Sequence, residues 1–193
     1  MAPLFSDVFP LNPSRYHEVT GSAACGFAAI ACGLANGPAI WFMEAWQTET
    51  INPNGLVPYC DPHHLLVGKC INATDLLAAT EEALRSGAVS MVVSEITVPL
   101  TLTAGRRLQL AAEAGGSTGL MIVPEGMGSN AARTRWQAMP LYDARDSTLM
   151  RWSLIKNKSG TSSIWTVRWD DKTHRISVVS EAGQRPHAAA RTL

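Results

Sequence analysis

Apolar residues in the first two thirds of the chain form short unbroken runs that are separated by longer segments with helical spacing. Residues 39–43 and 119–123 are continuous apolar runs, and 89–93 is apolar apart from Ser90, which is the pattern of strands buried on both faces. Segments 23–34 and 103–114 repeat small and apolar residues at helical spacing. This alternation predicts an α/β fold, with a mostly parallel sheet, right-handed crossovers and helices on both faces.

Turn and cap signals place the other elements of this part. Residues 17–19 predict a first strand and residues 65–67 a short third one, while segment 44–62 is rich in Asn, Pro and Gly and predicts a long loop with room for a helical turn. Thr74 is the predicted N-cap of a further helix, and Gly87 is well placed to end it.

After Pro124 the pattern changes to β-type residues interleaved with polar ones. Turn signals at 158–160 and 170–171 predict antiparallel hairpins at one edge of the sheet. Segment 182–193 has no periodicity and is predicted to be a disordered tail, which leaves residues 1–181 as a single domain. The predicted strands are 135–139, 151–155, 164–169 and 175–179.

Composition narrows the class of protein. The chain has 193 residues, no apolar stretch of the roughly 20 residues that a membrane helix needs, and no secretion signal at its start, so we expect no membrane contact and a cytoplasmic location. The four cysteines form no CxxC pair and are expected to be free thiols. A zinc site is not predicted, because the spacing of its candidate ligands matches no familiar pattern and favours a plain loop. Those candidates are Cys60, His63, His64 and Cys70.

Charge is unevenly distributed although the net charge is zero. Residues 1–132 hold five Lys and Arg against eleven Asp and Glu, a formal charge of −6, and residues 133–193 hold eleven against five, a charge of +6. Such a separation favours electrostatic steering of the basic part toward an acidic partner such as nucleic acid, or of one subunit's tail toward the body of another subunit. A solvated surface whose charges merely segregate explains it equally well.

Residues 21–28 form the segment with the most informative spacing. A phosphate-binding loop has the pattern G-x-x-x-x-G-K-[ST] between a strand and a helix, and here Gly21 and Gly26 stand at that spacing. Phe27 takes the lysine position and Ala28 the hydroxyl position, so the contacts to phosphate and magnesium are lost. A tight turn with close helix packing is the alternative. Glu95, after an apolar strand, is where nucleotidases place an acid linked to magnesium.

In the order of these pieces the chain resembles RecA over roughly residues 16–169, and more closely the ImuA family of damage-inducible mutagenesis proteins. SulA-like cell-division inhibitors are shorter relatives in this resemblance. The segments that carry it are 17–19, 81–89, 106–114 and 131–136.

The resemblance implies a RecA-like three-layer fold and an accessory role in error-prone translesion synthesis under the DNA-damage (SOS) response. The implied partners are an ImuB-like protein, an error-prone polymerase and RecA, with no enzymatic chemistry and no cofactor. The acid that would activate water is replaced by Trp46, although Glu44 is close by, and the loops matching the DNA-contacting ones, 97–103 and 125–130, are short. These departures argue against filament formation on DNA. A division inhibitor of the SulA type and a residual ATP-dependent switch are the alternatives.

Basic and aromatic residues interleave in the predicted hairpins. Such a pattern can bind single-stranded DNA weakly, through backbone attraction and base stacking, but the tryptophans fit an inward-facing core at least as well. Lys156 and Lys158 resemble RecA lysines that reach a neighbour's nucleotide, which suggests an edge for self-association or RecA docking. The set comprises Arg133, Arg135, Arg151, Lys156, Lys158 and Arg168, with Trp136, Trp152, Trp165 and Trp169.

Overall fold

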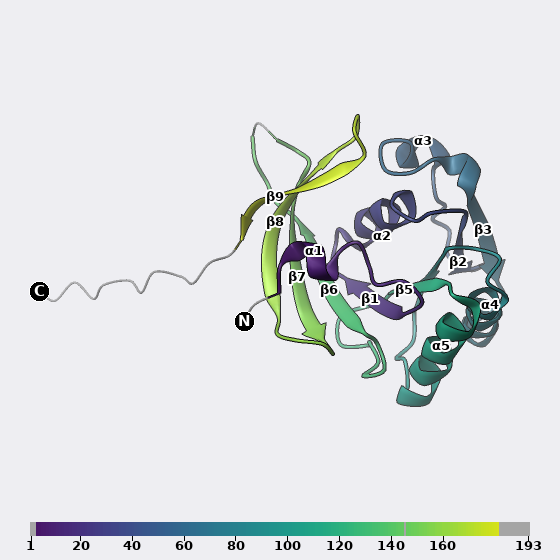
Figure 1. The fold of residues 1–193 in the computed structure, drawn as a ribbon. Helices are drawn as coiled ribbons and strands as arrows, with labels where there is room; N and C mark the ends of the chain where they lie inside the picture. Colours follow the sequence, from purple (N-terminus) through teal and green to yellow (C-terminus); the bar gives the residue numbers. More distant parts are fainter. Residues whose placement is uncertain (1–2, 145, 182–193) are drawn as a thin grey trace, which may run out of the picture.

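The computed structural model describes residues 3–144 and 146–181, so the predicted tail, 182–193, lies outside the described residues. The described strands form one mixed sheet in the order β3-β2-β4-β5-β1-β6-β7-β8-β9 (Figure 1). Predicted strands are confirmed, with bounds that shift by a few residues. The strands are β1 (Tyr16–Thr20), β2 (Ala39–Glu44), β3 (Leu65–Cys70), β4 (Met91–Glu95), β5 (Thr118–Ile122), β6 (Thr134–Pro140), β7 (Leu149–Asn157), β8 (Ser163–Asp170) and β9 (Arg175–Glu181).

Strand β6 was predicted to be one arm of an antiparallel hairpin, and its pairing differs from that prediction. It pairs in parallel with β1, where Glu18 lies opposite Arg135, and it is antiparallel only to β7. The connection 123–133 is long enough to cross β1, as a parallel neighbour requires. The parallel part of the sheet therefore extends from β3 to β6, and the antiparallel part, as predicted, follows β6 at one edge.

Helices lie on both faces of the sheet, as predicted. Helix α2 (Ala24–Gly33) and the short α1 (Phe5–Val8) cover one face, and α4 (Ala73–Ser86) and α5 (Leu102–Gly115) lie side by side on the other (Figure 1). The predicted long loop contains the helical turn α3 (Pro53–Leu56) and a short 3-10 turn. No helix in the described ranges is both long and apolar enough to cross a membrane.

The caps of α4 explain where that helix begins and ends. Gly87 adopts a left-handed conformation, with φ at 66°, and ends the helix as predicted. The N-cap is Asn72 and not Thr74, because the Asn72 side chain accepts hydrogen bonds from the backbone N–H groups of Thr74 and Asp75. Thr74 therefore lies inside the first turn.

An aromatic core joins α1 and α2 to the antiparallel strands. Phe27 of α2 lies between Phe9, Trp136 and Trp152, with ring centroids 4.4–5.6 Å away. All four tryptophans of the hairpin region are buried, which confirms the predicted core packing. The prediction that bases stack on them is wrong, because their ring faces are covered. These residues are Trp136, Trp152, Trp165 and Trp169.

Candidate functional site

The segment that matches the phosphate-binding pattern follows β1 at the carboxyl edge, the edge where the parallel strands end. Strand β1 ends at Thr20 and α2 begins at Ala24, so only residues 21–23 form the loop. Gly21 has φ at 98°, and a side chain there would lie 2.3 Å from the Ala138 carbonyl oxygen. This glycine therefore serves a tight turn against β6, which is the structural alternative considered above.

Two backbone donors at this loop already have acceptors within the protein. The Ala23 N–H donates to the Ala138 carbonyl at 3.1 Å, and the Ala24 N–H donates to the Gly21 carbonyl at 3.0 Å. A loop that cradles phosphate must instead present such N–H groups to the ligand. Strand β6 thus takes up one N–H group of the loop, which is not available to a phosphate.

The positions that match lysine and hydroxyl face the core. Phe27 and Ala28 are fully buried in the core beneath α2, and Phe27 belongs to the aromatic cluster described above. Gly26, in contrast, is not closely packed: a side chain there would meet no atom within 4 Å. Of the two glycines, only Gly21 is required by its surroundings.

Two acids at the carboxyl edge are held by indole N–H groups. Glu95, at the end of β4, accepts from Trp41 Nε1 at 2.8 Å and from Gln47 Nε2 at 3.3 Å. Glu44, at the end of β2, is buried and accepts from Trp46 Nε1 at 2.9 Å. Trp46 therefore does not simply replace a missing acid, because it orients the acid two residues before it.

A cavity of about 500 Å³ lies beside the loop, between the ends of β1, β4 and β5. Thr20, Gly21 and Ala24 line one side, and Glu95 and Glu125 contribute two carboxylates. No Lys or Arg is among its described lining residues. An acidic cavity with no cation disfavours a triphosphate, because nothing offsets the phosphate charge.

The predicted basic residues lie mostly at the opposite, amino edge of the parallel strands. Arg135 donates through Nε to Glu18 Oε2 at 2.6 Å, and Glu18 is fully buried. The other Glu18 oxygen accepts from the Ser129 N–H at 2.7 Å and from the Tyr16 hydroxyl. Burial and the Glu18 carboxylate raise the pKa of Tyr16. Arg135 thus neutralises a buried acid and is not offered to a partner.

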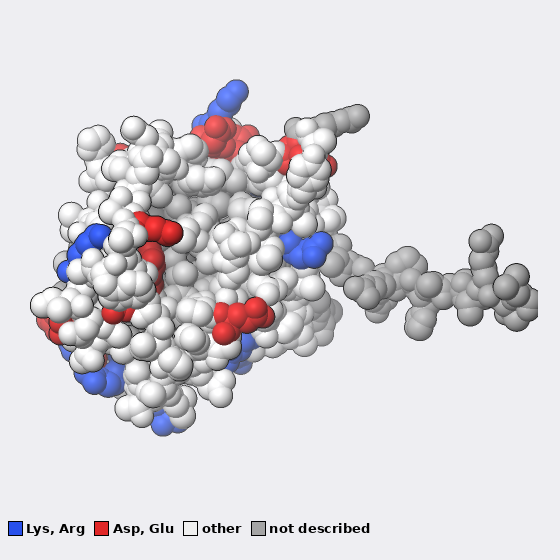
Figure 2. All heavy atoms as spheres, turned by 180° about the vertical axis from the view of Figure 1, so that it is seen from behind, with Lys and Arg blue, Asp and Glu red and all other residues white. Residues whose placement is uncertain are grey.

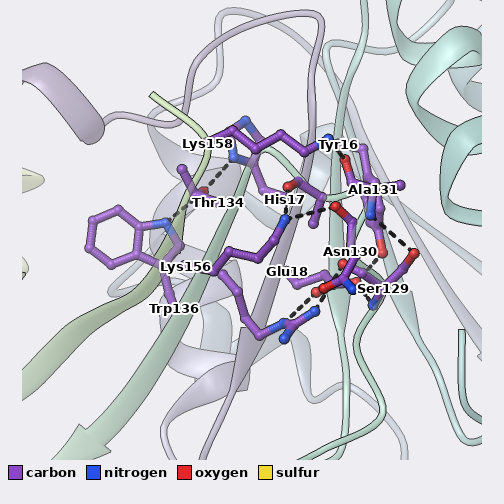
Figure 3. A network of polar contacts seen from close by, with 12 residues as sticks. Tyr16, His17, Glu18, Ser129, Asn130, Ala131, Thr134, Trp136, Lys156 and Lys158 are labelled. Carbon is purple, nitrogen blue, oxygen red and sulfur yellow. Dashed lines mark hydrogen bonds and ion pairs between the residues drawn. The ribbon is translucent and has the colours of Figure 1, made fainter. Parts of the chain in front are cut away.

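Lys156 and Lys158 bind the loop before β6 (Figure 3). The Lys156 ammonium donates to the carbonyls of Asn130, at 3.0 Å, and Ala132, and the Lys158 ammonium donates to the Ala131 carbonyl at 2.5 Å. Burial, Lys158 and Arg135 lower the pKa of Lys156 to about 8. Both lysines therefore have a role within the fold.

The remaining basic candidates do not join them in one surface. Arg133 is partly buried beside Lys158, whose backbone N–H donates to the Arg133 carbonyl at 3.0 Å. Arg168 lies on β8 opposite Leu149, toward the carboxyl edge, and pairs with Asp146. On the face seen in Figure 2, Lys and Arg are scattered and form no continuous strip. Arg168 therefore lies at the other end of the hairpin strands from Lys156 and Lys158, and contact of these residues with a partner stays a prediction.

A buried histidine lies next to this network and carried no role in the sequence interpretation. His17 is fully buried, and its Nε2 lies 2.9 Å from the Asn12 carbonyl. Its Nδ1 lies 2.7 Å from Thr134 Oγ1 (Figure 3). Trp136 Nε1 donates to the same Thr134 oxygen at 3.0 Å. Burial lowers the pKa of His17 to about 4; Arg133 and Arg15 contribute, while the Asn12 carbonyl opposes the shift. The sequence of this strand gave no signal of burial, because His17, Glu18 and Thr20 are three of its five residues.

The zinc candidates and the comparisons with known proteins add no further site. Within residues 3–144 and 146–181, no group of three or more His, Cys, Asp or Glu side chains is placed to hold a metal ion. No protein-family model matches the chain, and no curated protein is significantly similar to it.

Proposed function

We propose that this protein is a non-catalytic, RecA-like adaptor in error-prone translesion DNA synthesis. Its partners are an ImuB-like protein, an error-prone polymerase or RecA, and it binds no nucleotide. The observation that carries the non-catalytic part is the placement of Phe27: the position that matches the phosphate-binding lysine lies inside an aromatic core. A side chain there cannot reach a ligand at the loop.

Two features support the RecA-like part of the proposal. The degenerate loop follows the first strand at the carboxyl edge of a parallel sheet, where α/β proteins place their ligands. Antiparallel strands then extend that sheet at one edge, as the resemblance implies. The pathway itself rests on the resemblance of segments 106–114 and 131–136 to the ImuA family.

Several observations favour binding of proteins over binding of nucleotides. Strand β6 accepts a loop N–H that phosphate would require, and Glu95 and Glu125 give the adjacent cavity the wrong charge for phosphate. The tryptophans suited to stacking on single-stranded DNA are buried. What remains for recognition is the exposed surface of the α/β fold.

Two experiments test the proposal separately. Titration calorimetry with magnesium and ATP should show no binding, with RecA as the positive control, and micromolar affinity would overturn the non-catalytic assignment. Pull-downs of the purified full chain against an ImuB-like protein, RecA and the tubulin-like division protein test the pathway. Retention of the division protein alone would instead support the SulA-like alternative.

A further inference from the structure

A second cavity in the described part of the chain adjoins the start of α2 and shares Gln47 and Glu95 with the cavity beside the loop. It has a volume of about 660 Å³ and lies between α2 and segment 46–59, against the end of β2. This volume is within the range of about 300–1,000 Å³ that is typical of ligand sites. Gly26 of α2 helps to keep it open, because a side chain at that position would meet only empty space.

The lining combines aromatic rings with carboxylates. Trp46 and Tyr59 contribute exposed or partly exposed rings, and Glu49 and Glu95 contribute the charges. No Lys or Arg is among the described lining residues; Lys69 donates to the backbone carbonyl of Gln47 but does not line the cavity. Burial and then both carboxylates raise the pKa of the Cys25 thiol, which agrees with a negative potential in this space.

The polar groups of the cavity are already oriented. Trp41 and Gln47 each donate to a different oxygen of Glu95, at 2.8 and 3.3 Å, which leaves a lone pair on each oxygen for a ligand. The Trp46 indole N–H is fixed by Glu44 at 2.9 Å, and 63% of this residue is exposed. A fixed carboxylate beside an exposed indole ring suits a flat cation, which can stack on the ring and donate to the oxygens.

We propose that this cavity binds an arginine side chain of a partner protein. The guanidinium would stack on Trp46 and donate to Glu95, while its neighbours in the partner contact the apolar wall around Ala29 and Leu56. Charge complementarity selects this occupant, because an acidic aromatic cavity repels phosphate and carboxylate groups. The inference goes beyond the proposed function and holds whether or not the partner belongs to a mutagenesis pathway.

The test uses nuclear magnetic resonance of the full chain with ¹⁵N-labelled tryptophan. The Trp46 indole signal is assigned with Trp46→Phe, and the buried Trp136, whose indole N–H donates to Thr134 away from the cavity, serves as an internal reference. An acetylated and amidated Ala-Arg-Leu tripeptide should shift the Trp46 signal in a saturable manner, and the isosteric citrulline peptide should bind at least about tenfold more weakly. Absence of a saturable shift at about 10 mM arginine peptide, or equal binding of both peptides, would overturn the proposal.

Variants of the chain separate this site from general surface charge. Glu95→Gln keeps the shape of the side chain and should weaken arginine binding about tenfold or more, whereas Glu125→Gln, in the neighbouring cavity only, should weaken it less than twofold. Gly26→Leu should block the cavity, with Gly26→Ala as the matched control. Unchanged binding in both Glu95→Gln and Gly26→Leu would refute the site.

Other occupants give different results in the same experiment. Saturable shifts with inorganic phosphate or with a glutamate peptide would show that the cavity attracts anions, and would overturn the proposal. A shift of the Trp46 signal when only the protein concentration rises would show that a second copy of this chain fills the cavity, and would overturn the assignment of a separate partner.

Discussion

His17 should make the stability of this protein fall on mild acidification. The Asn12 carbonyl can only accept, so the proton of the neutral ring is on Nε2, and Nδ1 accepts from the Thr134 hydroxyl. Trp136 donates to that hydroxyl in turn. A second proton would turn Nδ1 from an acceptor into a donor. The Thr134 hydroxyl would then lose its acceptor, and a charge would lie at a site with no exposure to water. The folded protein therefore binds this proton less readily than the unfolded chain does.

The size of the effect follows from the pKa of His17, which burial lowers from 6.5 to about 4. The stabilising contribution is complete above pH 6.5 and is lost as the pH falls toward 4, because the unfolded state takes up the proton first. Linkage gives a loss of about 2 kcal/mol at pH 5 and about 3 kcal/mol at pH 4.

The assay compares urea unfolding of the natural chain and of His17→Gln at several pH values between 7 and 4. Glutamine is neutral throughout and can both donate and accept, so the carboxylates of the two proteins titrate alike and cancel in the comparison. The free energy of unfolding of His17→Gln should lie below that of the natural chain at pH 7, and the gap should narrow by about 2 kcal/mol at pH 5. Parallel pH profiles would refute a neutral, buried His17.

Three further changes test other parts of the structure. Phe27→Lys should destabilise the fold by about 3–5 kcal/mol in urea unfolding, because it places an ammonium group in the aromatic core. Calorimetry should show no gain of ATP binding, and a stable, ATP-binding variant would contradict this prediction. Gly26→Ala should raise stability by about 0.5–1 kcal/mol, measured by thermal unfolding, since the helix gains a better residue and the new methyl meets only open space; a lower stability would mean that the position is closely packed. Glu18→Gln should lower the free energy of unfolding in urea by about 3–5 kcal/mol, because it leaves the partly buried Arg135 without its counter-charge. Glu82→Gln, on the exposed face of α4, is the control. Equal losses in the two variants would count against a stabilising role of the buried pair.

The parallel half of the fold could be predicted because its signals are local. Unbroken apolar runs such as 119–123 mark buried strands, and Gly87 ends a helix through a conformation that glycine adopts easily. Strand β6 could not be assigned in the same way. Its alternating pattern is shared by parallel and antiparallel edges, and only the crossover of segment 123–133 over β1 decides its direction.

The candidate site was harder to predict, because spacing along the chain does not show which way a side chain points. The pattern of Gly21, Gly26 and Phe27 matches a phosphate loop, yet α2 begins at Ala24, so the last two positions already lie in the helix and Phe27 faces the core. From the sequence alone, the basic residues Arg135 and Lys156 indicated a surface for nucleic acid or a partner protein. Their actual acceptors, Glu18 and the carbonyls of residues 130 and 132, are distant in the sequence and near only after folding.

The uneven charge of the chain has a similar explanation. Part of the basic excess after residue 132 is used within the fold, since Arg135 neutralises Glu18 and Lys156 binds backbone carbonyls at the amino edge. Glu49 and Glu95 at the carboxyl edge receive no such compensation, because none of the ion pairs among the described residues includes them. Charge that the fold leaves unpaired beside a cavity is available to a partner. Steering should therefore bring basic groups of a partner to the carboxyl edge, and should not bring nucleic acid to the hairpins.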